Sequence, residues 1–139
     1  YNVPCQGFSY VGLITREDGS HEAIGQRLSS IIAKGSCWEW SLCLGHSKVY
    51  AGYNKPIRVA IYLGESRCEL GQMIYQSDWI KKEDWEKIVF SFTAQIEGRY
   101  ITLVADDGGK KINGNVLIDY LGPLTPCDRA SIPTWLDRL

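Results

Sequence analysis

The sequence contains no apolar run long enough to cross a membrane. A transmembrane helix needs about 20 consecutive apolar residues, and polar residues interrupt every stretch of this 139-residue chain before that length. The amino-terminal segment also lacks the basic and apolar regions of a signal peptide. We therefore expect no membrane insertion, and either a soluble chain or a processed piece of an exported protein.

The chain also lacks an excess of charge of either sign. Its 15 lysine and arginine residues are balanced by 16 aspartate and glutamate residues, so the formal net charge is -1 at pH 7. Nucleic acids and anionic membrane surfaces attract proteins through a basic field. This balance removes both from the expected partners.

Residues for catalysis are equally scarce. The two histidines, His21 and His46, each lie in a polar stretch without a neighbouring serine or cysteine motif, and we expect both to be solvated. Acid–base and nucleophilic catalysis need such groups within reach of one another. Glu65 and Glu69 form a carboxylate pair of the kind that a glycosidase uses, but only their spacing supports that function. We therefore expect no enzymatic activity.

The cysteines lack the spacing of a metal site. No two of them form Cys-x-x-Cys, which is typical of zinc sites and redox pairs. We expect disulfide bonds formed in an oxidising compartment, with small buried thiols as the alternative. The odd number leaves at least one thiol unpaired within the chain. The five cysteines are Cys5, Cys37, Cys43, Cys68 and Cys127.

The sequence does contain many short segments in which apolar residues alternate with polar ones. The alternation is clearest in 36–45, 57–63 and 88–93, and β-branched runs follow at 100–104 and 116–120. A period of two indicates strands. Six to eight short strands without a long helix predict one all-β domain, an antiparallel β-sandwich. The predicted core comprises Trp38, Trp40, Leu42, Ile57, Val59, Ile61, Ile88, Phe90, Phe92, Leu103 and Ile118.

The stretch from Asp84 to Leu124 organises this prediction. Glycine-bearing turns at 97–98, 107–109 and 113–115 separate its three strands, and glycine reaches positive φ at low cost. We expect the three strands to form one antiparallel sheet that the rest of the chain covers. The run 108–111 lacks the spacing of a phosphate-binding loop, and we interpret it as a hairpin turn.

Four segments, taken in order, resemble a known family. They are GFSYVGLITRED, LSSIIAKGSCWEWSLCLG, DWEKIVFSFTA and NVLIDYLGP. Together they resemble the galactose-binding-like jelly-roll domains of bacterial surface and secreted proteins. The likeness is greatest to domains of gliding-motility-associated and type IX-secreted proteins of Bacteroidetes, and more distant to carbohydrate-binding modules. It covers roughly Gln6 to Leu124.

This resemblance implies a jelly-roll β-sandwich over residues 1–127, followed over 128–139 by a tail or the start of a following segment. Such domains usually open with a further strand, and nothing before Cys5 matches it. We expect that strand to lie outside this sequence or to come from another chain. The resemblance also implies an extracellular, cell-surface or periplasmic location. It offers no explanation for Cys37.

Two functions are compatible with the resemblance. The first is a non-catalytic glycan-binding module at the cell surface, and the second is a protein-interaction or assembly domain of a surface, secretion or gliding apparatus. Aromatic residues outside the clearest strands favour the first, because sugar rings stack on such rings while polar groups bond to the hydroxyls. The alternative for Trp79 is that it closes an end of the sandwich. The candidate ligand-binding residues are Tyr50, Tyr53, Arg67, Gln72, Tyr75, Asp78 and Trp79.

The resemblance further implies a structural calcium ion at Asp119, the one acidic residue inside an otherwise apolar strand. A buried carboxylate needs a cation or several hydrogen bonds, and calcium takes oxygen ligands. By analogy with carbohydrate-binding modules, Glu17 and Asp18 are the early-strand ligands. The alternatives are that Asp119 caps a loop or pairs with Arg16 or Arg27.

The resemblance also implies a disulfide between Cys5 and Cys127, because the first and last strands of jelly rolls often lie side by side. The three other cysteines then contain at most one further pair within the chain. Among them we favour Cys43 with Cys68.

Overall fold

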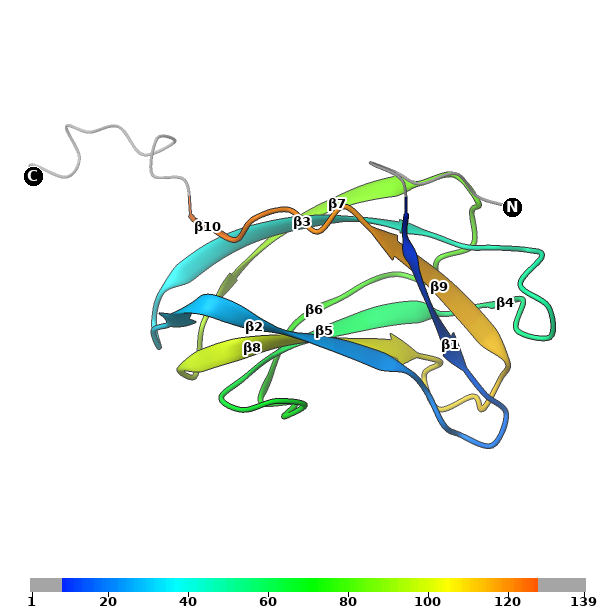
Figure 1. Ribbon diagram of the computed structural model, residues 1–139, viewed down its shortest axis with the longest axis horizontal. Coiled ribbons are helices and arrows are strands. Elements are labelled where there is room, and N and C mark those ends of the chain that lie inside the picture. Colours follow the sequence, from blue (N-terminus) through cyan, green and yellow to red (C-terminus); the bar gives the residue numbers. More distant parts are fainter. Residues whose placement is uncertain (1–8, 128–139) are drawn as a thin grey trace, which may run out of the picture.

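Two β-sheets pack face to face in the computed structural model, which describes residues 9–127 (Figure 1). This arrangement confirms the predicted all-β sandwich. The described residues contain no helix of the length and apolar character that a membrane span requires. The strands are β1 (Val11–Thr15), β2 (Ala23–Ile32), β3 (Cys37–Gly45), β4 (Lys55–Pro56), β5 (Arg58–Gly64), β6 (Gln72–Gln76), β7 (Glu86–Thr93), β8 (Gly98–Asp106), β9 (Gly114–Asp119) and β10 (Thr125–Pro126).

The three strands β7, β8 and β9 alternate between the two sheets. Sheet A has the order β1-β9-β3-β10, with β7 beside β3 and β4 beside β9, and sheet B has the order β2-β8-β5-β6. The prediction that β7, β8 and β9 form one sheet is therefore wrong. Each of these three strands pairs with partners far away in sequence, which its own alternation cannot specify. The turn at 107–113 accordingly connects the two sheets and does not close a hairpin.

The glycines in these turns serve two different purposes. Gly108 and Gly109 adopt the expected positive φ values of 65° and 79°. Gly98 and Gly114 instead start strands where a Cβ atom would collide with the side chains of Leu63 and Ile57. At these two positions glycine allows close packing between segments, and positive φ is not the reason.

The core fills the space between the sheets largely as predicted. Ile88 and Phe90, however, are only half-buried because β7 is an edge strand, paired only with β3 among the described strands. Phe90 stacks on Tyr75 with ring centroids 4.5 Å apart. Trp38 is half-buried because it lies beside the cleft described below. The predicted core residues that are buried are Trp40, Leu42, Ile57, Val59, Ile61, Phe92, Leu103 and Ile118.

The disulfide pattern differs from the prediction. Cys127 bonds to Cys37, with 5.3 Å between their Cα atoms, and not to Cys5, which lies outside the described residues. The reason is that β10, immediately before Cys127, pairs with the start of β3, where Cys37 lies. Cys43 is disulfide-bonded and Cys68 is a free, exposed thiol, so the predicted pair between them is also wrong.

The segment that follows β3 is buried, although its sequence is polar. His46 and Ser47 are 2% and 5% exposed, so the expectation that His46 is solvated is wrong. The Nδ1 atom of His46 lies 3.2 Å from the carbonyl oxygen of Asn115 on β9. The side chain of Asn115 bonds to both backbone groups of Ser47. Buried polar groups are tolerated here because they find partners on β9.

Candidate ligand-binding site

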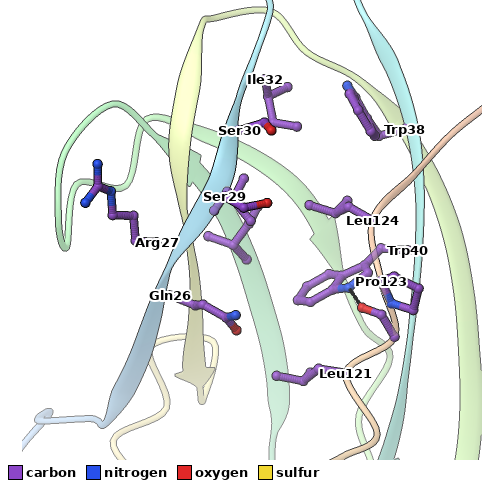
Figure 2. A pocket seen from close by; sticks show the side chains of 13 residues that line it. Gln26, Arg27, Ser29, Ser30, Ile32, Trp38, Trp40, Leu121, Pro123 and Leu124 are labelled. Atoms are coloured by element: carbon purple, nitrogen blue, oxygen red, sulfur yellow. Dashed lines mark hydrogen bonds between the residues drawn. The ribbon is translucent and has the colours of Figure 1, made fainter.

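A cleft of about 740 Å³ opens between β2 of sheet B and the segment that follows β9 (Figure 2). We call residues 121–126 the strap. The cleft is lined from β2 by Gln26, Arg27, Leu28, Ser29, Ser30 and Ile32, from β3 by Trp38 and Trp40, from β8 by Ile101, and from the strap by Leu121, Gly122, Pro123 and Leu124.

An irregularity in β2 leaves this cleft open. The strand pairs with β8 up to Arg27 and then again only at Ile32, with a register shift between them. Residues 28–31 therefore leave the regular ladder. Gln26 is paired with the buried Ile101 and shares its side of the sheet, so its amide points into the cleft, whereas Arg27 points away (Figure 2).

The strap forms a fixed opposite wall. Its Gly122 N–H donates to the Ser41 carbonyl at 2.9 Å, and the indole N–H of Trp40 donates to the Gly122 carbonyl. A Cβ atom on Gly122 would lie 2.6 Å from the Ser41 Oγ, so glycine permits this close contact. The pairing of β10 with β3 and the Cys37–Cys127 disulfide hold the end of the strap.

The cleft combines an aromatic ring with apolar walls and uncharged polar groups. The half-buried Trp38 lies at one end, where its indole N–H donates to Ser36 Oγ at 2.8 Å. Gln26, Ser29 and Ser30 offer an amide and two hydroxyls, and all three residues are exposed. A few polar groups within a mainly apolar cavity are typical of small-molecule sites.

Sequence reasoning placed Trp38 and Trp40 in the core and did not identify the cleft. The cleft depends on the register shift in β2 and on the strap, which is distant in sequence. The available signal was Ser29-Ser30, which interrupts the apolar alternation of 23–32.

The predicted ligand-binding residues do not meet in one site. Tyr50 covers Gly12 of β1, where an added Cβ atom would lie 2.9 Å from the Tyr50 ring. The carbonyl of Tyr53 accepts a hydrogen bond of 2.7 Å from Asn115 Nδ2. Arg67 is exposed in the loop between β5 and β6. These three positions belong to separate loops or serve packing.

Two further candidates support the edge strands. The Gln72 amide donates to the Thr93 carbonyl at 3.0 Å and accepts from the Gln95 N–H at 2.7 Å, so it joins β6 to the end of β7. Tyr75 stacks on Phe90. Burial raises the pKa of Tyr75, and the charges of nearby carboxylates raise that pKa further.

Trp79 lies against the turn that connects β8 to β9. Its ring centroid is 4.6 Å from the Arg58 guanidinium carbon and 4.2 Å from the Lys110 ammonium nitrogen. A Cβ atom on Gly108 would contact the ring at 3.0 Å. The half-buried ring thus packs against protein groups, which agrees with the alternative that Trp79 closes one end of the sandwich.

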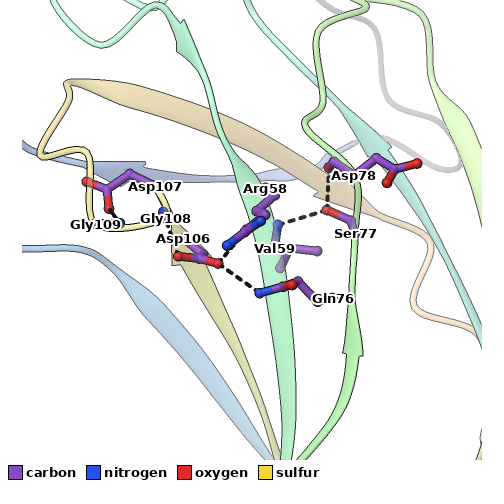
Figure 3. A network of polar contacts seen from close by, with 9 residues as sticks. All are labelled: Arg58, Val59, Gln76, Ser77, Asp78, Asp106, Asp107, Gly108 and Gly109. Carbon is purple, nitrogen blue, oxygen red and sulfur yellow. Dashed lines mark hydrogen bonds and ion pairs between the residues drawn. The ribbon is translucent and has the colours of Figure 1, made fainter.

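Arg58, which lies over the Trp79 ring, belongs to a network of polar contacts. Figure 3 shows this network. The Nε of Arg58 forms an ion pair of 2.6 Å with Asp106 Oδ2, which also accepts from Gln76 at 3.2 Å. The Gly108 N–H donates to the other oxygen of Asp106 at 2.9 Å. The nearby candidate Asp78 is exposed, and its backbone carbonyl accepts a hydrogen bond from the Ser77 hydroxyl.

The contacts of Asp106 predict a dependence of stability on pH. Burial alone would raise the pKa of Asp106, but the hydrogen bond from Gly108, together with the hydrogen bond and the positive charge of Arg58, lowers that pKa below its ordinary value. A carboxyl group with a lowered folded-state pKa stabilises the fold above its unfolded pKa, and this contribution disappears as the pH falls through the folded value. We expect Asp106→Asn to lose less stability than wild type between about pH 5 and about pH 2.

Urea unfolding at a series of pH values measures this difference. Asp78→Asn, at an exposed position, is the matched control and should keep the wild-type slope. Equal slopes in Asp106→Asn and wild type would contradict the assignment.

The predicted calcium ligands lie at opposite ends of the β1–β9 pair. Asp119 follows Ile118, which pairs with the first residue of β1, whereas Glu17 and Asp18 lie beyond the last residue of β1. Asp18 instead accepts bonds from Ser20, which lower its pKa. The described residues contain no group of three or more histidine, cysteine or acidic side chains arranged for a metal.

One of the other proposed partners of Asp119 is engaged elsewhere. Arg16 forms an ion pair of 3.6 Å with Glu22. The Tyr120 N–H donates to Asp119 Oδ1 at 2.7 Å, which agrees with the alternative of a capping role. The predicted ligand set is therefore not assembled, and calcium binding at Asp119 stays a prediction.

Comparisons with known proteins identify the fold. No protein-family model and no curated protein sequence match this chain. A solved structure titled "CBM4 structure and function" matches with a TM-score of 0.56 and 10% identity over 84% of this chain and 83% of the other. "Family 16 Carbohydrate Binding Module-2" matches with a TM-score of 0.53 and 15% identity, over 88% of this chain and 82% of the other. "EclA C-terminal domain; sugar-binding protein" matches with a TM-score of 0.50 and 12% identity, over 90% of this chain and 84% of the other. The chain has the β-sandwich fold found in carbohydrate-binding modules.

Proposed function

We propose that this chain is a non-catalytic module that binds glycans in the cleft between β2 and the strap. The observation that carries the proposal is the juxtaposition of the half-buried Trp38, the apolar walls and the polar side chains of Gln26, Ser29 and Ser30. The C–H faces of sugar rings pack on aromatic and apolar groups, while amides and hydroxyls bond to sugar hydroxyls. The sugar-binding titles of the structures with this fold support the same class of ligand.

A location outside the cytoplasm belongs to the proposal. The Cys37–Cys127 bond supports it, because structural disulfides persist mainly in oxidising compartments. We place the module on a secreted or surface protein, in the extracellular space or the periplasm. A surface or secretion apparatus of Bacteroidetes, as the sequence resemblance implies, is the most specific form of this proposal. An assembly domain of such an apparatus is the alternative.

Titration calorimetry with cellohexaose, xylohexaose and mannohexaose tests the cleft. We expect Trp38→Ala to weaken binding of the recognised sugar about tenfold, equivalent to about 1.4 kcal/mol, because the aromatic contact is lost. Trp38→Phe should retain most of the affinity. Val89→Ala, at an exposed position in sheet A, is the control and should bind as wild type does.

Unchanged affinity in a folded Trp38→Ala variant would exclude the cleft as the binding site. If the wild type binds none of these sugars, the glycan-binding proposal fails and the assembly alternative gains support.

A further inference from the structure

The outer face of sheet B has small residues at its centre. Direct partners in an antiparallel pair lie on the same face, and Ala60 pairs with Val104 just as Thr102 pairs with Gly25. The intervening residues, such as Leu103, belong to the core cluster, so these four point outward. Ala60, Thr102 and Val104 are nevertheless only 2%, 3% and 7% exposed. The Thr102 hydroxyl is the one buried side-chain polar atom of the described residues that has no hydrogen-bond partner.

Aromatic and apolar side chains flank this centre. Tyr62 lies opposite Thr102, and Tyr100 lies opposite Gly64 on the same face, so the two tyrosines are diagonal neighbours about 7–8 Å apart. Both are half-buried. Met73 lies opposite Tyr62 and is 46% exposed. We call Tyr62, Tyr100 and Met73 the aromatic strip. Their side chains are accessible beside a centre that is itself buried.

The strip leads into a second pocket, of about 390 Å³, at the Tyr100 end. Tyr100 lines it together with Arg27, Arg99, Glu65 and Glu97. The ion pairs among the described residues are Arg16 with Glu22 and Arg58 with Asp106. The four charged side chains of the pocket are therefore not paired with one another.

Figure 1 shows the loop between β5 and β6 projecting from the side of sheet B that faces away from sheet A. Glu65, which lines the pocket, is in this loop. The loop therefore borders the outer face at the end where the pocket lies.

We infer that the outer face of sheet B is a second carbohydrate-binding surface, which takes an extended chain of neutral sugars. Sugar rings stack on Tyr62 and Tyr100, whose half-exposed rings offer apolar faces. The guanidinium and carboxylate groups of the pocket bond to sugar hydroxyls as donors and acceptors. Two arginines and two glutamates leave no net charge at the pocket, which favours an uncharged ligand over an acidic one.

This inference rests on the proposed glycan-binding function and adds a site separate from the cleft. Arg27 borders both sites, but its side chain points away from the strap (Figure 2). The cleft lies between the sheets, whereas Tyr62 and Tyr100 lie on the outward side of sheet B. Each site can therefore be changed without altering the other.

Calorimetry with cellohexaose, xylohexaose and mannohexaose, together with amide NMR shifts, distinguishes the sites. We expect two binding events per protein in wild type. In Trp38→Ala, the binding event at the cleft should weaken about tenfold and the other should keep its wild-type affinity. The double variant Tyr62→Ala/Tyr100→Ala should lose the binding event at the outer face and keep the one at the cleft. Tyr62→Phe/Tyr100→Phe should keep both, because the rings are kept. In wild type, the amide signals of Gly25 and Thr102 should shift on titration, which gives a readout that needs no variant.

This inference would be overturned, and the cleft proposal left intact, if wild type showed one binding event, if Trp38→Ala weakened it about tenfold, and if the Gly25 and Thr102 signals did not shift. Binding that keeps its wild-type affinity in Trp38→Ala and disappears in the tyrosine double variant would support the outer face and reject the cleft. Failure of wild type to bind any of the three sugars overturns both.

Discussion

Replacing Asn115 by alanine is expected to lower the free energy of unfolding by about 3–5 kcal/mol, because it leaves several buried groups without partners. The Asn115 side chain is 0% exposed. Its Oδ1 accepts from the Ser47 N–H at 3.0 Å, and its Nδ2 donates to the carbonyls of Ser47 and Tyr53 at 2.8 and 2.7 Å. A buried donor or acceptor that loses its partner costs about 1–3 kcal/mol. Urea unfolding measures the loss.

Asn113→Ala is the matched control for this substitution. The Asn113 side chain accepts one hydrogen bond of 2.9 Å, from the exposed Glu17 N–H, which water can replace. We expect a loss below about 1 kcal/mol. If Asn115→Ala cost no more than Asn113→Ala, the buried network would not stabilise the fold as described.

Removal of the Cys37–Cys127 disulfide should have a comparably large effect. The bond joins residues 90 positions apart, so it restricts the unfolded chain strongly, and loss of a native disulfide typically costs about 2–5 kcal/mol. We expect the double variant Cys37→Ala/Cys127→Ala to lose that amount in urea unfolding. It should also bind glycans in the cleft more weakly, because the end of the strap is no longer fixed to β3.

Cys68→Ala controls for the removal of cysteine as such. Cys68 is exposed and free, and surface substitutions usually change stability by less than about 0.5 kcal/mol. A double variant as stable as Cys68→Ala would show that the disulfide contributes little. A destabilised double variant with unchanged glycan affinity would separate the stability of the fold from the shape of the cleft.

The strands and much of the core could be predicted from the sequence. In β3, Trp40 and Leu42 lie two residues apart and both face the core, and Val59 and Ile61 do the same in β5. The strand period sets this alternation locally, since successive side chains point to opposite faces. The prediction overestimated the burial of Phe90 because the same alternation occurs in central and edge strands.

The candidate site was less accessible to prediction. The seven predicted ligand residues are dispersed among loops, edge strands and one end of the sandwich, and several serve packing. Trp38 was assigned to the core because its neighbours in sequence are indistinguishable from those of a buried strand residue. Its exposure follows from the register shift in β2, on the other sheet.

By itself, the sequence determined which segments become strands and which side of most of them is apolar, because these properties depend on residues two positions apart. Only the tertiary structure decided the sheet that each strand joins, the partner of Cys127 and the existence of the cleft. These features arise from contacts across long separations, such as the 90 positions between Cys37 and Cys127. Such contacts depend on how the two sheets pack and not on any local pattern.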